Sequence, residues 1–481
     1  MENKSTFARW LKITSVISKY FVFYKLGKRR KDIFGKRIRY ACEELGPIFI
    51  KLGQILSTRY DILNNEDCAE LQKLLDQVEP IPLQKVEEII EKDFGKKYAA
   101  VFKTFNTTPL ASASIAQVHR ATLHDGKKVA VKIRRPEVSE HVESDIRVLK
   151  QVVAVASLFS PTLRHVDGKQ VVSQLRDWML IEMDFKQEVK NIKQMKSYLA
   201  HAAEHTDTSE EEANNLIIPD VYDEYCTENV IVMEYIDGVP LSKFETIKDN
   251  LDYDIMSAAK AIAMLTVRHW LTARNDEYIF HADPHPANLL ILKHGKIALV
   301  DFGLIGRLSP EQTRHTADLF LAVYARNLER SIEYALAIPG VDYDKYSDKL
   351  RPDIKEYLRK TPTTGVGFWF MGFVRIFVKH KVPIPYDIIL FGRQNAVGDG
   401  LISTILPGKT TIDIMGEELA RALRKKITQN ILDVDFSRLA YAVSEEVKNS
   451  PDRVVSILER LSKDPYAIVK DFHEATSKKY E

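Results

Sequence analysis

The chain has 481 residues, enough for two or three domains, and its 45% hydrophobic and 28% charged content is that of an ordinary soluble globular protein. A formal net charge of +2 excludes a strong overall attraction to nucleic acid, so we expect no nucleic-acid partner. The three cysteines, Cys42, Cys68 and Cys226, lack metal-ligand spacing, which argues against a disulfide scaffold or a zinc site and predicts a reducing compartment.

Residues 1–100 are predicted as a helical extension. The first 45 residues combine an apolar body, LKITSVISKYFVFY, with a basic end in which eight lysines and arginines lie between positions 25 and 39. This pattern fits a membrane-surface helix, and it also fits a core-packing helix with solvated lysines. No apolar run is long enough to span a bilayer. Helical periodicity continues through FIKLGQILSTR, CAELQKLLDQV and LQKVEEIIEKDF.

Residues 101–240 alternate between strand and helix signals. The runs VFKTFN, IAQVHRATL and KVAVKIRR predict strands, with a turn at Asp125-Gly126 between the last two. Two helical segments follow, VESDIRVLKQVVAVASLF and LRDWMLIEMDFKQEVKNIKQMKSYL, and then the strand segments IIPDVYDEY and NVIVMEYIDG. This order predicts a small mixed lobe. Residues 241–481 are predicted to be mostly helical.

The segment FHADPHPANLLILKHGKIALVDFGL interrupts the helical region with two β-runs and three polar residues at fixed spacing. Asn288 follows Asp283 by five positions, and Asp301 opens an Asp-Phe-Gly thirteen positions later. This is the H-x-D-x-x-x-x-N and D-F-G arrangement of protein kinases, in which the first Asp faces the nucleophile and the other two residues hold magnesium. The sequence therefore predicts a kinase-like catalytic centre.

The strand and loop that would contact a nucleotide lie upstream. Lys132 lies within the apolar run VAVKI, where kinases place the lysine that contacts nucleotide phosphates. The preceding loop should be rich in glycine so that backbone N–H groups approach the phosphates. Its tip instead carries Ala111, Ser112, Ala113 and Ser114. We therefore predict a stiffer loop that holds the nucleotide differently.

A polar helix and a hinge complete the predicted nucleotide site. The segment IEMDFKQEVKN predicts one helix that carries Glu182 and, about two turns later near the same face, Glu188. Apolar neighbours indicate partial burial, so we expect these acids to form ion pairs, with Glu188 as a partner of Lys132. The hinge is placed at Glu234 to Ile236, where backbone groups would pair with adenine.

The segment that follows Gly303 departs from protein kinases. It reads LIGRLSPEQTRHTADLFLAVYARN, which predicts a direct return to helix where an activation segment ending in Ala-Pro-Glu is usual. The platform for a peptide substrate is therefore expected to be missing. His281 and His285 have H-x-x-x-H spacing, but they lie in a proline-containing loop and magnesium prefers oxygen ligands, so we exclude a histidine metal site.

Together these motifs resemble the UbiB/AarF-type atypical kinases, a family associated with ubiquinone and other isoprenoid lipid metabolism. The K-x-G-Q marker of that family occurs as Lys51-Leu52-Gly53-Gln54, and ASASIAQVH is similar to its alanine-rich loop. IEMDFKQEVKN and HADPHPAN resemble its E-x-D segment and catalytic loop. The resemblance implies an α+β, bilobal protein-kinase-like fold: an N-terminal helical extension (1–100), an N-lobe with inserted helices (101–240) and a helical C-lobe (241–481).

The resemblance also implies a role for each site residue. Lys132 would contact the nucleotide and pair with Glu188, and Asp283 would be the catalytic-loop carboxylate. Asn288 and Asp301 would hold Mg²⁺.

The extension would supply the remaining implied groups. Lys51 and Gln54 would enter the active site, with Lys51 near Glu182 and Asp301. An extension in the substrate groove would block peptides, which agrees with the missing activation segment.

The expected function is that of an atypical kinase or ATPase that binds ATP or ADP with Mg²⁺ and serves isoprenoid quinone or other lipid metabolism. Its expected partners are a lipid or quinone precursor and quinone-biosynthesis proteins, and a homo-oligomer stays open. We expect a cytoplasmic location with peripheral contact at the inner membrane face. Two alternatives remain: a nucleotide-switched pseudokinase scaffold for a biosynthetic complex, and a kinase that phosphorylates a small molecule or protein.

Overall fold

The computed structural model describes residues 2–22, 33–57, 63–71, 73–74, 79–159, 168–205, 215–271, 277–324, 328–338, 343–360 and 365–415. The chain divides into two units, Met1–Thr411 and Ile412–Glu481, and every helix and strand named below belongs to the first. Most of the basic stretch that suggested a membrane-surface helix, from position 25 to 31, lies outside the described residues. Within the described residues, no helix has the length and apolar character needed to cross a membrane.

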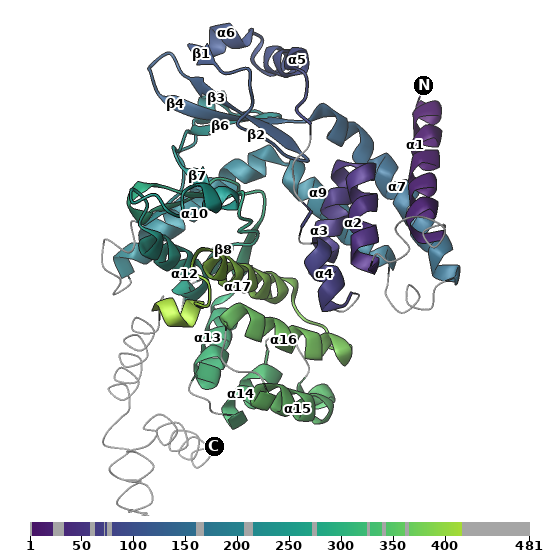
Figure 1. Cartoon of the computed structure of the whole chain (residues 1–481), viewed down its shortest axis with the longest axis vertical. Helices are drawn as coiled ribbons and strands as arrows, with labels where there is room; N and C mark the ends of the chain where they lie inside the picture. The colour runs from purple at the N-terminus through teal and green to yellow at the C-terminus, as the bar shows by residue number, and fades with distance from the viewer. Residues whose placement is uncertain are drawn as a thin grey trace, which may run out of the picture. The chain divides into compact units, whose positions relative to one another are not determined.

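The N-lobe is built on a five-stranded antiparallel sheet in the order β1-β3-β4-β6, with β2 also paired to β3. Its strands are β1 (Thr104–Phe105), β2 (Ala111–Ser112), β3 (Ala116–Thr122), β4 (Lys128–Arg134) and β6 (Val230–Glu234). The turn between β3 and β4 requires a glycine because Gly126 has φ +92°. β-branched residues of β4, Val129 and Val131, pack with Val86 and Ile90 of α5 (Leu83–Phe94), beside the short α6 (Tyr98–Val101) (Figure 1).

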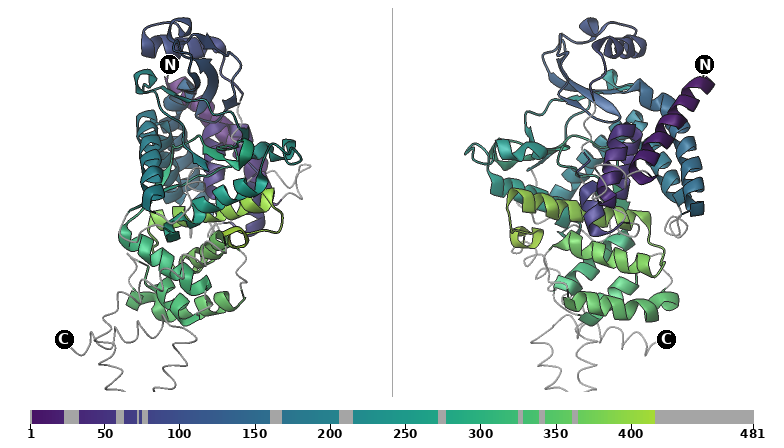
Figure 2. Two further views of the ribbon diagram at one scale, coloured as in Figure 1. Left: turned by 90° about the vertical axis from the view of Figure 1, so that its left-hand side faces the viewer. Right: turned by 45° about the vertical axis from the view of Figure 1, so that its right-hand side comes forward.

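The extension helices share one hydrophobic core with two helices inserted in the N-lobe. These elements are α1 (Glu2–Ile17), the π-helical turn η1 (Ser18–Val22), α2 (Phe34–Leu45), α3 (Pro47–Leu56), α4 (Asn65–Leu71), α7 (Pro136–Phe159) and α9 (Gly168–Met183). Leu45 and Phe49 of the extension lie in the same buried cluster as Leu149 and Leu175. Figure 2 shows the purple extension helices against the blue inserted helices. The core thus fixes α3 relative to the N-lobe.

The single helix predicted for IEMDFKQEVKN is wrong, because two helices meet there. α9 ends at Met183 and α10 (Phe185–His205) begins after Asp184. The Asp184 carboxylate accepts a hydrogen bond from the backbone N–H of Gln187 at 2.9 Å, which satisfies one of the free donors at the start of α10. Glu182 and Glu188 therefore lie on different helices rather than along one face.

The C-lobe holds the catalytic unit on short strands among helices. Its two small sheets have the orders β5-β10-β9-β7 and β11-β8. The elements are β5 (Leu216–Ile217), β7 (Val239–Pro240), η4 (Leu241–Thr246), α12 (Ile255–Leu271), β8 (Tyr278–His281), β9 (Leu289–Ile291), η5 (Lys293–Gly295), β10 (Ile297–Leu299), β11 (Ile305–Leu308), α13 (Pro310–Tyr324), α14 (Leu328–Leu336), α15 (Tyr343–Lys360), α16 (Val366–Lys379) and α17 (Tyr386–Ile405). The short η3 (Asp223–Tyr225) packs instead on the N-lobe sheet beside β6.

The direct return to helix predicted after Gly303 is also wrong. The strand β11 comes first and pairs antiparallel with β8, so that Ile305 lies opposite His281 and Leu308 opposite Tyr278. α13 begins immediately afterwards at Pro310. β8 leads into the catalytic loop and β11 follows the Asp-Phe-Gly. Their pairing therefore brings Asp283 and Asp301 close together.

Candidate active site

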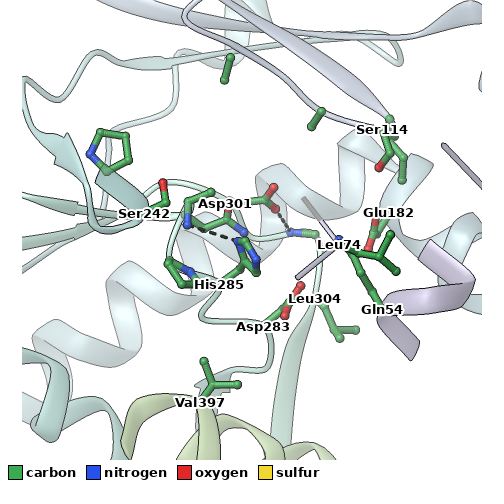
Figure 3. A pocket seen from close by; sticks show the side chains of 18 of the residues that line it. Gln54, Leu74, Ser114, Glu182, Ser242, Asp283, His285, Asp301, Leu304 and Val397 are labelled. Atoms are coloured by element: carbon green, nitrogen blue, oxygen red, sulfur yellow. Dashed lines mark hydrogen bonds between the residues drawn. The ribbon is translucent and has the colours of Figure 1, made fainter. Parts of the chain in front are cut away.

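A cavity of about 760 Å³ collects side chains from the extension, the N-lobe and the C-lobe. Its lining includes Lys51 and Gln54 from α3, Lys132 from β4 and Asp301 of the Asp-Phe-Gly. Figure 3 shows Asp283 and Asp301 within the cavity, with Gln54 and Glu182 approaching from the extension side. The motifs that are widely separated in the sequence therefore meet around one space.

Lys132 lies at the centre of a charged group. Its Nζ is 2.6 Å from the Oε1 atom of Glu188 and 3.4 Å from Oδ2 of Asp301. Burial lowers the pKa of Lys132, but the two carboxylates outweigh this effect, so its pKa is raised and the ammonium is retained at neutral pH. Glu188 Oε1 also accepts the backbone N–H of Phe302 at 3.3 Å. The predicted pairing of Lys132 with Glu188 is present in the structure.

Asp301 is held as a carboxylate that still reaches the cavity. Its Oδ1 accepts the backbone N–H of Gly303 at 3.0 Å, and its side chain is 39% exposed. Burial raises its pKa, but Lys132, the Gly303 N–H and Lys51 outweigh this effect and lower the pKa to about 2. Asp301 is therefore fully ionised at neutral pH.

Asp283 is paired with a residue that the sequence did not identify. Oδ1 of Asp283 accepts a hydrogen bond from the Arg393 guanidinium of α17 at 2.7 Å. The same guanidinium lies over the ring of Trp178 in α9, 5.0 Å from its centroid. Burial raises the pKa of Asp283, but Arg393 and then Lys51 outweigh it, so the pKa is lowered. Asp283 is ionised but strongly bound, which makes it a weak base.

His281 organises the catalytic loop as a neutral imidazole. Its Nδ1 accepts the backbone N–H of Asp283 at 3.3 Å, and its Nε2 faces the backbone oxygen of Asp301. The proton therefore belongs on Nε2, which donates to that oxygen. Burial lowers the pKa of His281 in spite of this bond, which agrees with the neutral form. His281 thus joins the catalytic loop to the Asp-Phe-Gly, a structural role that excludes metal binding through Nε2.

The extension forms an ion pair with the end of α9. Nζ of Lys51 is 2.8 Å from Oε1 of Glu182, and both side chains are nearly buried. Lys51 also lowers the pKa values of Asp283 and Asp301, after larger contributions from other groups. α3 and the end of α9 therefore close one side of the cavity with paired charges.

Most of the predicted site residues line the same cavity, and two do not. Those that line it are Lys51, Gln54, Ala111, Ser112, Ala113, Ser114, Lys132, Glu182, Glu188, Asp283, Asn288 and Asp301. The predicted hinge residues Glu234 and Ile236 are not among the described residues of its lining. Glu234 instead lies at the end of β6, where its backbone N–H donates to the Asp220 oxygen at 2.8 Å.

The donor set on the cavity wall suits magnesium. Asp301 offers a carboxylate that remains ionised, and Asn288, half-buried on the same wall, offers an amide oxygen. Hard oxygen donors from one or two side chains, completed by phosphates and water, are what Mg²⁺ takes in nucleotide enzymes. Among the described residues no group of three or more His, Cys, Asp or Glu side chains could hold a metal. The residues present therefore fit Mg²⁺ bound together with a nucleotide.

The antiparallel N-lobe sheet, the Lys132–Glu188 pair and the Asp-Phe-Gly beside a catalytic loop define a protein-kinase-like protein. Comparison with known families agrees: residues 73–335 match the model of the ABC1 atypical kinase-like domain. That match covers more than half of the chain, so the protein belongs to the ABC1 atypical kinase-like family. Lys51 and Gln54 precede the matched residues and Arg393 follows them.

The chain is also similar to individual proteins and to a solved structure. The chain is 31% identical over 359 residues to the uncharacterized protein slr0889 of Synechocystis, a match that covers 73% of this chain and 85% of the relative. It is 32% identical to the probable protein kinase UbiB of Aeromonas hydrophila over 72% of this chain, but only 62% of that relative. A solved structure of Rv3197 with erythromycin from Mycobacterium tuberculosis aligns with a TM-score of 0.49 and 23% identity, over 71% of this chain and 83% of that one.

Proposed function

We propose that this protein binds ATP or ADP with Mg²⁺ and transfers or hydrolyses the terminal phosphoryl group, in support of isoprenoid quinone or other lipid metabolism. One observation carries the proposal: Lys132, Glu188 and Asp301 form a bonded group in the same cavity as Asn288 and Asp283. These are the groups that position nucleotide phosphates and oppose the charge that develops during phosphoryl transfer.

Each residue has a defined task in this proposal. Lys132, kept charged by its two carboxylates, contacts the nucleotide phosphates, and Glu188 keeps its ammonium in place. Asn288 and Asp301 bind Mg²⁺, which when present neutralises phosphate charge. An oxygen nucleophile, from water or an acceptor hydroxyl, forms a bond to the terminal phosphorus. The bond to the bridging oxygen breaks, ADP leaves with that electron pair, and the proton of the nucleophile passes to an oxygen of the transferred phosphoryl group.

The way in which the nucleophile loses its proton bears on whether the protein acts as a kinase or as an ATPase. Asp283 is bound by Arg393 and has a lowered pKa, so it removes a proton poorly before the phosphoryl group has moved. Phosphoryl transfer through a loose transition state needs little early proton removal. The weak basicity of Asp283 therefore supports a slow basal hydrolysis of ATP. An acceptor molecule that changes the Asp283–Arg393 pair would accelerate the reaction.

The Lys51–Glu182 pair favours a small acceptor over a peptide. It closes the side of the cavity that faces the extension, and Gln54 lies beside it. The quinone or lipid connection rests on the family and on the name of the UbiB relatives. A nucleotide-switched scaffold is the second candidate, because the bound state of Asp283 also suits a protein that holds ATP without turnover.

The test is phosphate release from ATP by the purified protein with Mg²⁺, measured alone and with liposomes and a phenolic quinone precursor. Asp301→Asn should reduce the rate at least ~100-fold, because the charge that holds Mg²⁺ is lost. Asp252→Asn is the matched control, since Asp252 is exposed and its pair with Lys293 lies outside the cavity lining. ATP binding with no turnover above Asp301→Asn in any mixture would leave only the scaffold function.

A further inference from the structure

The alanine-rich loop is closed by one backbone bond of its own and one from Arg135. The backbone N–H of Ala113 donates to the oxygen of Ala116 at 2.8 Å, and the backbone N–H of Arg135 donates to the oxygen of Ile115 at 2.8 Å. In a glycine-rich loop such N–H groups would be free to approach phosphates. Here the Ala113 N–H is already used, so the loop has a fixed shape before a nucleotide arrives.

Arg135 joins this loop to a second segment of the chain. Its Nε donates to the oxygen of Ala113 at 2.8 Å, and its Nη2 donates to the Ser112 hydroxyl at 2.6 Å. The same Nη2 donates to the backbone oxygen of Glu79 at 2.7 Å. Arg135 is 6% exposed and is not among the described residues of the cavity lining. It acts from behind the loop.

A buried polar chain on β3 reinforces this connection. Oε1 of Gln117 accepts the backbone N–H of Ile81 at 2.8 Å, and the Gln117 Nε2 lies 2.8 Å from Nε2 of His119. Because the Gln117 amide nitrogen is a donor, the His119 Nε2 accepts and its Nδ1 donates to the Asn106 oxygen. Burial lowers the pKa of His119, which agrees with a neutral ring. The AQVH segment thus serves to fix residues 79–82.

We propose that Arg135 is a positioning residue of the nucleotide site, which makes the loop 111–116 and the segment 79–82 a single unit. Both parts face the nucleotide cavity, the first through Ala113 and the second through Pro80. The segment 79–82 lies within the extension predicted for residues 1–100, so the clamp also links the extension to the nucleotide loop. This inference rests on the proposed nucleotide function and adds a residue that acts through the loop.

Loss of the clamp should weaken nucleotide binding by increasing the cost of ordering the loop. Arg135→Met removes the two hydrogen bonds that hold the loop and the one that connects it to Glu79. Ordering a loop on binding reduces affinity, and we expect the Kd for MgADP to rise about tenfold. Ser112→Ala removes only one of these bonds and should fold normally, with a smaller rise in Kd.

Two measurements test the proposal. Hydrogen–deuterium exchange of the nucleotide-free protein reports the amides of Ala113 and Ile81, and calorimetric titration with MgADP reports Kd. Arg134→Met is the matched control, because the neighbouring guanidinium bonds to the Met183 oxygen and to Asn229 instead of the loop. We expect faster exchange in the loop and in residues 79–82 for Arg135→Met and Ser112→Ala, and unchanged loop exchange for Arg134→Met.

The outcomes separate the clamp from the proposed function. Unchanged exchange at both segments in Arg135→Met and Ser112→Ala overturns the clamp, whatever the nucleotide affinity is. Faster exchange with an unchanged Kd overturns the positioning role. Absence of MgADP binding in the unaltered protein rejects the proposed function, and the positioning role with it, while the exchange data still decide whether the clamp exists.

Discussion

Asp283 carries its charge among several polar groups contributed by different elements. Arg393 from α17 contacts it directly, and Lys51 from α3 acts on it from the extension side. His285 and His281 of its own loop also lower its pKa, and the charge of Asp283 adds to the effect of burial that raises the pKa of Tyr386. Because Arg393 makes the largest favourable contribution, this arginine controls how easily Asp283 takes up a proton.

Replacing Arg393 with methionine should raise the pKa of Asp283, because burial then acts against the charged form with less opposition. If turnover needs ionised Asp283, the acidic limb of the pH–rate profile moves to higher pH in Arg393→Met. In the unaltered protein the folded pKa is depressed, so the stability that Asp283 contributes is present above about pH 3.9 and is lost only at lower pH. The rate of phosphate release is measured between about pH 4 and pH 9, in steps on the order of one pH unit.

Arg393→Lys keeps a cation and should restore most of the original profile. In an Asp283→Asn background the residual rate should lack this acidic limb, and Arg393→Met should cause no shift there, because the group through which the arginine acts is gone. A shift of equal size in both backgrounds would show that Arg393 acts by another route.

The site residues that could be predicted from the sequence are those whose partners lie nearby in the chain or at the spacing of a known motif. Asp283, Asn288 and Asp301 belong to one strand-loop-strand unit, so their spacing alone placed them in one cavity. Arg393 lies 110 residues from Asp283 and looks like an ordinary polar position of an apolar helix. Its pairing with Asp283 is seen only in the folded structure, where α17 brings Arg393 to the catalytic loop.

At the scale of elements, α13 and α14 meet through a half-buried histidine, His315. The rings of His315 and Tyr334 meet edge to face with centroids 6.1 Å apart. Burial lowers the pKa of His315 to about 4, against a smaller opposite effect of a bond to the Tyr334 backbone. The folded chain therefore keeps this ring neutral at pH 5, where an unfolded chain would protonate it.

His315→Phe should make the protein less sensitive to acid. Since the folded pKa lies below the unfolded value of about 6.5, the stabilisation is complete above pH 6.5 and is lost as the pH falls from there toward 4. The Tm of the variant relative to the unaltered protein should therefore rise between pH 7.5 and 5, as measured by thermal unfolding. The exposed His124→Phe is the control, and an equal pH response in both variants would contradict the assignment.

Of the two elements that were predicted wrongly, one had a local sequence signal that was outweighed, and the other had none. Asp184 followed three positions later by Gln187 has the pattern of a helix start, but the continuous helical periodicity on both sides favoured one helix. The strand β11 has only four residues, Ile305 to Leu308, and takes its conformation from pairing with β8. Short strands of this kind depend on their partner, so the sequence around them is a weak guide.

At the scale of the whole Met1–Thr411 unit, the extension is part of the N-lobe core. Its helices bury Leu45 and Phe49 against α7 and α9, and Arg9 of α1 bonds to both carboxylate oxygens of Asp145 in α7. The Asp145 side chain is fully buried, so Arg9 is needed to compensate its charge. The helical character of the extension was predictable from periodicity, but its sharing of a core was not. The domain boundary at residue 100 stays a prediction.

A chain that begins at residue 79 should therefore fail to fold stably, although it retains the Asp283, Asn288 and Asp301 motifs. The truncation exposes Leu175 and Met179 of α9 and leaves Asp145 without Arg9. Breaking a buried ion pair alone costs about 3–5 kcal/mol, a large share of the roughly 5–15 kcal/mol that stabilises a typical domain. Thermal unfolding should lose its cooperative transition, and binding of a hydrophobic dye should rise. Lys51→Ala, which opens the cavity without removing the core, should unfold cooperatively. If the truncated chain melted like the full chain, the extension would be a separable lid rather than a part of the N-lobe core.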